Sequence, residues 1–295
     1  MLSQPQLAAP LSHHTGRMTK VAIVGVGLIG GSFGLALRKA GFTGELLGVS
    51  SRRAIEDGLK IGAITAEATL AEAASRSDII YLAQPVDRIL DTLSALARLT
   101  GPDCLITDAG SSKQVIVDHA AAAGLASQFL GGHPMAGKEK GGVLSAEPDL
   151  FRHKPYILTP DRVANRSTLL FREWLDRIGA EVVEMSPEEH DRTVALTSHV
   201  PQIVSTALAL TLARKQNQHD ARIHGPGLLD MTRLAMSSAH LWTGILRTNS
   251  NAVNEALNDF VTCVREIQKN IATGDLEKLF GVAGEWAKSI RTNRP

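Results

Sequence analysis

The sequence has few cysteines, few aromatic residues and almost no net charge. Its 295 residues include two cysteines, Cys104 and Cys263, and 4% aromatic residues. Two cysteines so far apart exclude a disulfide framework, and their apolar surroundings predict buried free thiols in a reducing compartment. Lysine and arginine (31) balance aspartate and glutamate (30), so no bulk charge attracts nucleic acid or anionic lipid. A bound anion must therefore be held by a local site.

Long apolar runs are also missing. No uninterrupted apolar run reaches about 18 residues, so no transmembrane helix is expected. Residues 1–17 are polar, contain Pro5 and Pro10 and lack the pattern of a signal peptide, which predicts a disordered tail. Hydrophobic residues (44%) and charged residues (21%) occur in globular proportions, over a length that suits two domains. We therefore expect a cytoplasmic protein that binds neither membrane nor nucleic acid.

From residue 20 to about residue 159 the chain alternates between short apolar runs and longer amphipathic ones, and two further strands around a helix follow. Strand-length runs separated by helix-length segments predict β-α-β units and a doubly wound, parallel, Rossmann-type sheet. The expected strands are 21–24, 45–49, 78–83, 105–108, 129–131, 155–158 and 181–185. The expected helices are 28–40, 54–61, 87–99, 113–123 and 167–178.

The pattern changes at Ser186, after which only helices are expected. Ser186 is a predicted N-cap, with Pro187 in the first turn and Glu189 completing a capping box. The expected helices are 188–215, 228–237, 250–272 and 276–290, with a loop at 216–226. A kink is expected at Pro201, inside the first of these helices. Helices this apolar need a partner surface. We therefore predict that residues 187–295 form a helical substrate and dimerisation domain of a homodimer.

A glycine-rich turn with the pattern G-x-G-x-x-G follows the first expected strand and opens the first expected helix. The first glycine permits the turn, the second allows a pyrophosphate to approach, and the third allows close packing of helix on strand. Free N–H groups at the start of the helix favour phosphate. The predicted cofactor contacts are Gly25, Gly27, Leu28, Ile29 and Gly30. Residues 18–186 are therefore predicted to be a dinucleotide-binding domain.

The end of the second expected strand bears on the choice of dinucleotide. An NAD site usually has a carboxylate there that accepts a hydrogen bond from the ribose 2′-hydroxyl. This chain has Ser50 and Ser51, followed by Arg52 and Arg53, which suit a 2′-phosphate. The two arginines can also be a solvated start of a helix. We predict NADP, with NAD as the alternative.

Two polar loops, at 107–113 and 131–137, follow expected strands, where open α/β sheets bind ligands. His133 lies in the second, between a glycine pair and Pro134, on what we expect to be a rigid loop. A histidine there can accept the proton of a substrate hydroxyl while a hydride leaves the same carbon. On its own it can equally be a structural histidine.

Five motifs occur along the chain: GVGLIGGS, TDAGSSK, GGHPMAG, EEHD…SHVPQ and DMTRLA. In this order and at these distances, over about residues 20–286, they resemble the prephenate/arogenate dehydrogenases of tyrosine biosynthesis. The resemblance implies oxidative decarboxylation of prephenate to 4-hydroxyphenylpyruvate, or of arogenate to tyrosine, with hydride transfer to NADP or NAD. The predicted partner is therefore a small-molecule substrate.

The resemblance also implies residue roles. His133 matches the catalytic histidine that binds the ring hydroxyl, and Ser111 matches a serine that helps to orient it. Arg233 matches the arginine that binds a substrate carboxylate. Without the resemblance, Ser111 can be an N-cap and Arg233 a surface ion-pair residue.

His199 and Gln202 lie three residues apart on one face of a predicted helix and are candidate substrate contacts. Gln202 stands where many prephenate-using relatives have a second histidine. Because glutamine carries no charge at neutral pH, the choice between prephenate and arogenate stays open. His199 can equally be a core histidine, Asp191 can sense an amino group or pair with a cation, and Lys138 stands where relatives often have a small hydroxyl residue.

Two other functions remain open. A β-hydroxyacid dehydrogenase or an imine reductase also joins a nucleotide domain to helices, but the former typically uses a lysine on the first long helix, and 194–202 contains none. A non-catalytic NADP sensor would bind nucleotide without turnover. It gives no reason for His133, Ser111 and Arg233 to occur together. No metal site is predicted, because metal-ligand spacing is absent.

Overall fold

The computed structural model describes residues 18–160, 166–215, 223–274 and 276–292. The predicted tail, 1–17, and most of the predicted loop at 216–226 lie outside the described residues. The strands are β1 (Lys20–Val24), β2 (Glu45–Val49), β3 (Ala66–Glu67), β4 (Ile79–Leu82), β5 (Leu105–Asp108), β6 (Phe129–Pro134), β7 (Pro155–Thr159) and β8 (Glu181–Glu184).

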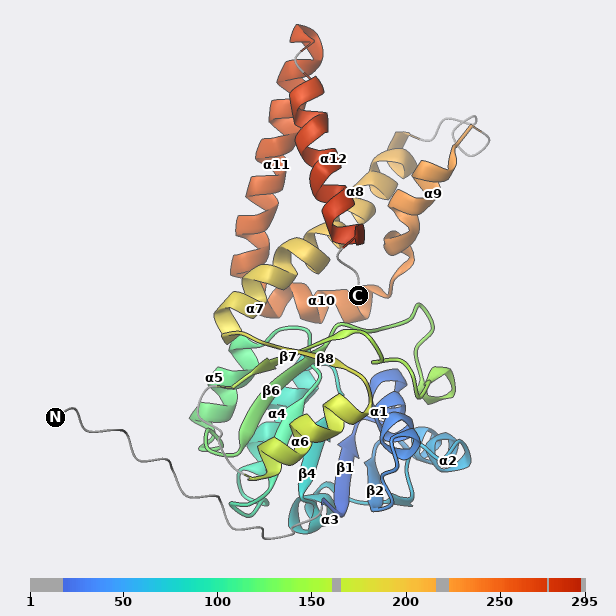
Figure 1. Cartoon of the computed structure of the whole chain (residues 1–295), viewed down its shortest axis with the longest axis vertical. Coiled ribbons are helices and arrows are strands. Elements are labelled where there is room, and N and C mark those ends of the chain that lie inside the picture. Colours follow the sequence, from blue (N-terminus) through green and yellow to red (C-terminus); the bar gives the residue numbers. More distant parts are fainter. Residues whose placement is uncertain (1–17, 161–165, 216–222, 275, 293–295) are drawn as a thin grey trace, which may run out of the picture.

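The strands form one sheet in the order β3-β2-β1-β4-β5-β6-β7-β8 (Figure 1). All neighbours are parallel except β6 and β7. The predicted Rossmann-type sheet is thus confirmed, with one reversed strand pair. The reason is that the described connection between β6 and β7 contains only a 3₁₀ turn, η1 (Val143–Ser145), and a parallel neighbour needs a longer crossover, usually a helix.

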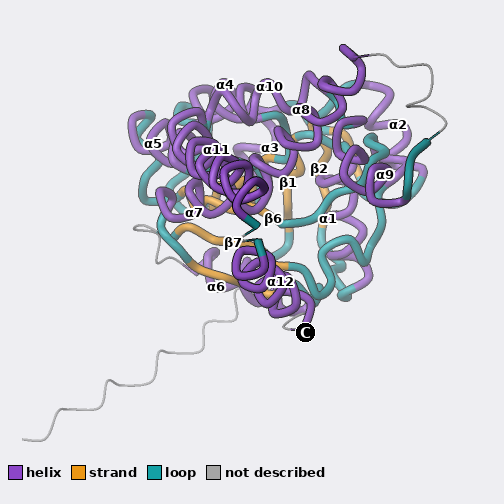
Figure 2. Tube along the Cα trace, turned by 90° about the horizontal axis from the view of Figure 1, so that it is seen from above, coloured by secondary structure: helices purple, strands orange, loops and turns teal. Residues whose placement is uncertain are grey.

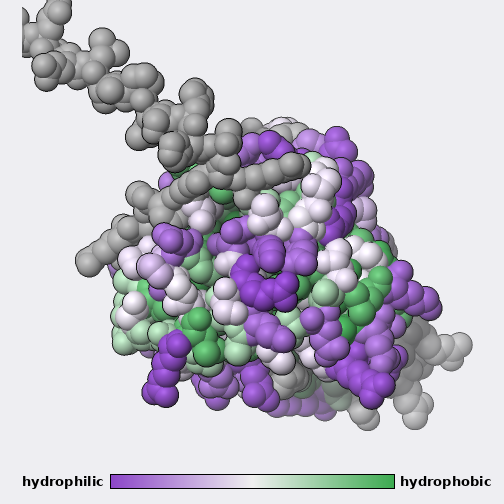
Figure 3. Space-filling model, turned by 90° about the horizontal axis from the view of Figure 1, so that it is seen from below, coloured by the Kyte–Doolittle hydropathy of each residue, from purple (hydrophilic) through white to green (hydrophobic). Residues whose placement is uncertain are grey.

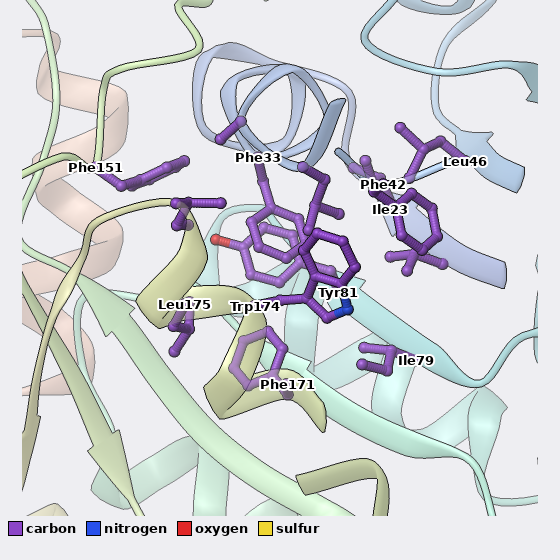
Figure 4. Packing of buried hydrophobic residues seen from close by; sticks show 14 of the residues in the cluster. Ile23, Phe33, Phe42, Leu46, Ile79, Tyr81, Phe151, Phe171, Trp174 and Leu175 are labelled. Atoms are coloured by element: carbon purple, nitrogen blue, oxygen red, sulfur yellow. The ribbon is translucent and has the colours of Figure 1, made fainter. Parts of the chain in front are cut away.

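Among the described residues, six helices cover the two faces of the sheet. They are α1 (Leu28–Lys39), α2 (Arg52–Lys60), α3 (Leu70–Arg76), α4 (Val86–Leu96), α5 (Gln114–Ala122) and α6 (Arg166–Arg177). Buried residues of α1, α2 and α6 join one core cluster, and those of α3, α4 and α5 join a second. In the first cluster Phe33 stacks on Tyr81, with ring centroids 4.0 Å apart, and Phe171 and Trp174 complete the layer (Figure 4). The core holds the strands, and with them the loops at their carboxyl ends, in fixed positions.

The described part of the helical region, residues 187–215, 223–274 and 276–292, lies over the carboxyl-terminal edge of the sheet (Figures 1 and 2). Its elements are α7 (Pro187–Val194), the π-helix η2 (Ala195–His199), α8 (Val200–Lys215), α9 (Pro226–Thr232), the 3₁₀-helix η3 (Arg233–Met236), α10 (Ala239–Thr248), α11 (Ser250–Thr273) and α12 (Glu277–Thr292). Sequence patterns missed β3, α3 and α10. The first two are short, and α10 contains Gly244 and two threonines, which are weak helix formers.

One helical stretch, Pro187–Lys215, joins the sheet to the rest of the helical region. Near the predicted kink at Pro201 the helix contains a π turn, Ala195–His199, which ends two residues before the proline. A proline and a π turn are both recognised causes of a helix kink. By length and hydropathy alone this stretch could cross a membrane, a property shared by core helices of soluble proteins. Here it packs on α5 and α11 and buries His190 and Asp191.

Apolar side chains are exposed along α11 and α12. They are Phe260, Val261, Val264, Ile267, Ile271, Phe280, Val282, Trp286 and Ile290. The opposite end of the molecule, seen in Figure 3, mixes hydrophilic and hydrophobic residues. The prediction that both cysteines are buried is wrong for Cys263, because its apolar run on α11 lies on this outward face, whereas Cys104 is buried and both are free.

Candidate active site

The glycine-rich turn adopts the geometry that a dinucleotide requires. Gly25 has φ +97°, in the left-handed region, and a Cβ there would lie 2.5 Å from the Ala83 carbonyl oxygen. A Cβ at Gly30 would collide with the Gly25 carbonyl oxygen. Gly27, in contrast, faces open space, with no heavy atom within 4 Å of the position that a Cβ would take, and it is the N-cap of α1, which has no side-chain cap of its own. This cradle and its free N–H groups fit a pyrophosphate.

A cavity of about 840 Å³ opens in front of this turn. It lies between the turn, the end of β2, the start of α4 and the loop 141–144, with Ser50, Ser51 and Arg53 in its lining. Arg52 is not in the lining; its Nε lies 2.9 Å from a carboxylate oxygen of Glu56. The structure therefore separates the two arginines that the sequence treated alike.

Arg88, from α4, lines the same cavity and was missed by the sequence analysis. No local pattern marks it, because it follows a different strand from Arg53. Arg53 lies 4.0 Å from Asp57, also in the lining, and Arg88 lies 3.9 Å from Asp91. Both arginines are largely exposed, so they remain available to an anionic ligand at the rim of the cavity.

The sequence predicted that His133 lies on a loop after the strand. In the structure His133 lies within β6 itself. The strand continues to Pro134 because β7 pairs with it, and His133 is opposite Ile157. A Cβ at Gly132 would lie 2.6 Å from the Asp108 carbonyl oxygen, so the glycine allows β6 to approach β5 closely. His133 is only 9% exposed. It is therefore held at the carboxyl end of a central strand, the end at which open α/β sheets bind ligands.

A chain of short contacts continues from His133 into the helical region. Nδ1 of His133 lies 2.8 Å from Nε2 of His190, and Nδ1 of His190 lies 2.7 Å from Oδ1 of Asp191. The Asp191 carboxylate also accepts backbone N–H groups of Lys113, at 2.7 Å, and Gln114, at 3.0 Å. Of the two roles considered for Asp191, neither is seen among these contacts. It binds backbone amides and a histidine.

Lys113 and Asp108 form a completely buried ion pair, and Lys113 lies close enough to His133 to influence its charge. Asp108 also accepts the backbone N–H groups of Gly110, at 2.8 Å, and Gly132, at 2.9 Å. These bonds compensate for the cost of removing both charges from water. The charged residues of the TDAGSSK motif therefore hold β5, β6 and α5 together.

Burial sets the protonation of the histidines. Burial, followed by the proximity of the ionisable His190 and Lys113 side chains, lowers the pKa of His133 well below 6.5. Burial also lowers the pKa of His190, which the neighbouring Asp191 partly opposes. Both rings are thus neutral near pH 7, and a neutral imidazole has one nitrogen that can accept a proton.

Ser111 and Arg233 lie in different parts of the chain. Ser111 lies in the turn between β5 and α5 and is half-buried. Arg233 begins η3, and its guanidinium lies 3.3 Å from Glu139, six residues after His133. Lys138 binds the carboxylate of Glu147 and the Ser145 carbonyl oxygen.

Gln202 and His199 are both buried inside the helical region. Nε2 of Gln202 donates to the Leu234 carbonyl oxygen at 2.9 Å, next to Arg233, and its Oε1 has no partner among the described residues. His199 lies 3.3 Å from the Asn249 side chain, and burial lowers its pKa to about 4.

Comparisons with known proteins agree on one family. Residues 33–184 match the family described as "Prephenate dehydrogenase, nucleotide-binding domain", and residues 186–285 match "Prephenate dehydrogenase, dimerization domain". The prephenate dehydrogenase of Bacillus subtilis is 35% identical over 269 residues, which cover 88% of this chain and 72% of that protein.

Two solved structures share the fold over almost the whole chain. The first is prephenate dehydrogenase from Aquifex aeolicus in complex with hydroxyphenyl propionate and NAD+, with a TM-score of 0.85 and 30% identity over 95% of this chain and 98% of that one. The second is Synechocystis arogenate dehydrogenase, with a TM-score of 0.79 and 28% identity over 93% and 99%.

Proposed function

The chain is a nicotinamide-dependent dehydrogenase that belongs to the prephenate dehydrogenase family, and we propose that it oxidatively decarboxylates prephenate to 4-hydroxyphenylpyruvate. The observation that carries the proposal is the state of His133. Its ring is neutral and buried, and His190 engages its Nδ1, which leaves Nε2 for a substrate. A neutral histidine at the end of a central strand suits the acceptance of a hydroxyl proton.

The reaction needs a proton acceptor, a hydride acceptor and a site for carboxylate. The bound nicotinamide supplies the hydride acceptor. Nε2 of His133 accepts the proton of the ring hydroxyl as the hydride leaves that carbon, and returns it to the oxygen once CO2 has left and the ring is aromatic. Ser111 hydrogen-bonds the same hydroxyl region, and Arg233 binds a substrate carboxylate.

We propose NADP as the preferred cofactor. No carboxylate follows β2 at the position of Ser50, and Arg53 and Arg88 both line the cavity. Two guanidinium groups beside two serines suit a 2′-phosphate better than a 2′-hydroxyl. NAD remains the alternative, because its diphosphate would use the same glycine-rich turn.

Arogenate is a second candidate substrate, favoured by Gln202. Nε2 of Gln202 donates to the Leu234 carbonyl oxygen, whereas Oε1 is buried and accepts no hydrogen bond from any described residue. A buried acceptor without a donor costs free energy, and the ammonium group of arogenate could supply one. The keto group of prephenate has no hydrogen to donate. Of the two substrate contacts considered in this helix, we therefore retain Gln202, and we assign His199 to the core.

We further propose a cytoplasmic homodimer with a dinucleotide-binding domain over residues 18–186 and a helical substrate and dimerisation domain over 187–295. The exposed apolar side chains of α11 and α12 support a second copy as partner, in line with the description of the matched family. Two free cysteines fit a reducing compartment.

The test is initial-rate kinetics of the purified chain, with prephenate and arogenate each offered with NADP+ and with NAD+. Turnover of prephenate with NADP+, with 4-hydroxyphenylpyruvate as the product, supports the proposal. Turnover of arogenate alone would replace it by the second candidate. Binding of NADP+ without turnover of either substrate would overturn both and favour a nucleotide sensor.

A further inference from the structure

We propose that His190 and Asp191 form a positioning relay that holds His133 in one tautomer, with the proton on Nδ1 and an unprotonated Nε2 facing the substrate. The tautomer follows from the structure alone. Its catalytic use rests on the proposed function, in which Nε2 of His133 accepts a proton.

The relay begins at Asp191. Its carboxylate accepts two backbone N–H groups, from Lys113 and Gln114, at the N-terminus of α5. No side chain of α5 itself caps that end, so Asp191 provides the cap from another element. An ionised carboxylate has acceptors only. The nitrogen 2.7 Å from Oδ1, Nδ1 of His190, must therefore carry a proton.

The second step fixes His133. With its proton on Nδ1, a neutral His190 has an acceptor at Nε2. Nδ1 of His133 lies 2.8 Å from that atom and must therefore donate to it. A neutral His133 with its proton on Nδ1 has its lone pair on Nε2. The opposite tautomer would bring two lone pairs together in a buried site.

The charges around the two rings keep both neutral. The ionisable neighbours of His133 are His190, Lys113 and His199. Those of His190 are Lys113, Asp108 and Asp191. Burial disfavours a charged imidazole at both positions, and Lys113 opposes a positive charge on either ring. At His190 the hydrogen bond with Asp191 raises the pKa, but it offsets the effect of burial only in part.

Contacts from three elements hold the relay in place. Asp191 is bound to α5 through the two backbone amides, and the side chain of Asn249, at the start of α11, donates to its carbonyl oxygen at 2.8 Å. The rings of His133 and His190 meet edge to face, with centroids 5.0 Å apart. The ring of His133 is therefore fixed in orientation as well as in protonation.

The direct test is nuclear magnetic resonance of the full chain labelled with ¹⁵N-histidine, which reads the protonated nitrogen of each ring without any turnover. We expect His133 in the wild-type chain to be protonated on Nδ1 and not on Nε2. In His190→Leu the signals of His133 should change toward a mixture of the two tautomers. Protonation of wild-type His133 on Nε2 would overturn the relay.

Kinetics then tests what the relay contributes. In His190→Leu we expect kcat to fall by at least about 10-fold, because part of His133 presents the wrong nitrogen, while KM for substrate and Kd for NADP+ change by less than about 2-fold. His190→Gln, whose amide oxygen can stand near the position of Nε2, should restore part of kcat. His119→Leu, a histidine on α5 that binds Ser94, is the matched control and should behave as wild type.

The outcomes separate this inference from the proposed function. Wild-type His133 protonated on Nδ1 in a chain that turns over neither substrate would leave the tautomer standing and remove the function. An unchanged kcat in His190→Leu, or a uniform loss of stability and activity that His190→Gln does not recover, would reduce His190 to a packing residue. If His190→Leu does not fold, the relay is tested by the tautomer of His133 in the wild-type spectrum and by the kcat of His190→Gln.

Discussion

Nδ1 of His133 lies 2.8 Å from Nε2 of His190, and this contact joins a strand of the sheet to the first helix of the helical region. The proposed proton acceptor thus comes from one part of the chain, and the group that sets its tautomer comes from the other. A shift of the helical region relative to the sheet would disturb His133 directly. Catalytic competence and the packing of the two parts are therefore coupled.

The lowered pKa of His133 predicts the acid side of the pH profile. Because burial favours its neutral form, the ring keeps its accepting nitrogen as pH falls below 6.5. We expect kcat/KM to stay near its plateau at pH 6 and to decline only at lower pH. Measurement of kcat/KM from pH 5 to 8 checks this. An acid limb with an apparent pKa at or above 6.5 would show that His133 is solvated.

The cofactor site predicts unequal roles for neighbouring arginines. Arg53→Ala and Arg88→Ala should each weaken NADP+ binding roughly 3- to 10-fold, because both side chains are largely exposed and their interaction with a phosphate is screened by water. Arg52→Ala, which removes only a pair with Glu56, is the control. Ser50→Asp should shift preference toward NAD+. Equal effects of Arg52 and Arg53, measured by titration with NADP+ and NAD+, would refute the assignment.

Two glycines of the same turn should have different roles: Gly27 should matter for dinucleotide binding and Gly30 for the stability of the fold. A Cβ at Gly27 meets open space, so Gly27→Ala should fold normally and weaken dinucleotide binding at least about 10-fold, because the methyl group occupies the approach of the pyrophosphate. A Cβ at Gly30 meets the Gly25 carbonyl, so Gly30→Ala should lower the free energy of unfolding by about 1–3 kcal/mol. Thermal unfolding and nucleotide titration separate the two. A destabilised Gly27→Ala with intact binding would contradict this division.

Arg233 should contribute mainly to substrate binding. Arg233→Ala removes the proposed partner of a substrate carboxylate, and we expect KM for prephenate to rise about 10-fold or more while kcat falls less. Arg192→Ala, an exposed arginine paired with Glu188 on α7, is the matched control. Steady-state kinetics at saturating NADP+ measures KM and kcat of both variants and so distinguishes a substrate-binding arginine from a surface arginine. An unchanged KM would make Arg233 a surface residue whose partner is Glu139.

Local motifs predicted the part of the site that depends on local structure. The glycine pattern requires only a strand, a turn and a helix, and Gly25 and Gly30 are packed as that pattern demands. The alternation of apolar runs likewise predicted most strands. Its one error in direction, the reversed pairing of β7 with β6, arose because apolar runs carry no information on strand orientation.

Contacts between distant segments could not be predicted. Asp191 and Lys113 are 78 residues apart, and only the fold shows that one caps the helix that follows the other. Arg88 joins the cofactor cavity because β4 lies next to β1, a neighbour relation that no local pattern contains. Cys263 is exposed in the single chain because its apolar run on α11 faces outward, and an apolar run alone does not show whether it faces the core or the surface.

The most direct test of the account is the kcat of His133→Asn, measured beside its Kd for NADP+. Asparagine retains a polar side chain but accepts no proton, so we predict a loss of roughly 10²- to 10⁴-fold in kcat with prephenate and a Kd within about 2-fold of wild type. An unchanged kcat would contradict the account, because the proton would then be accepted by another group.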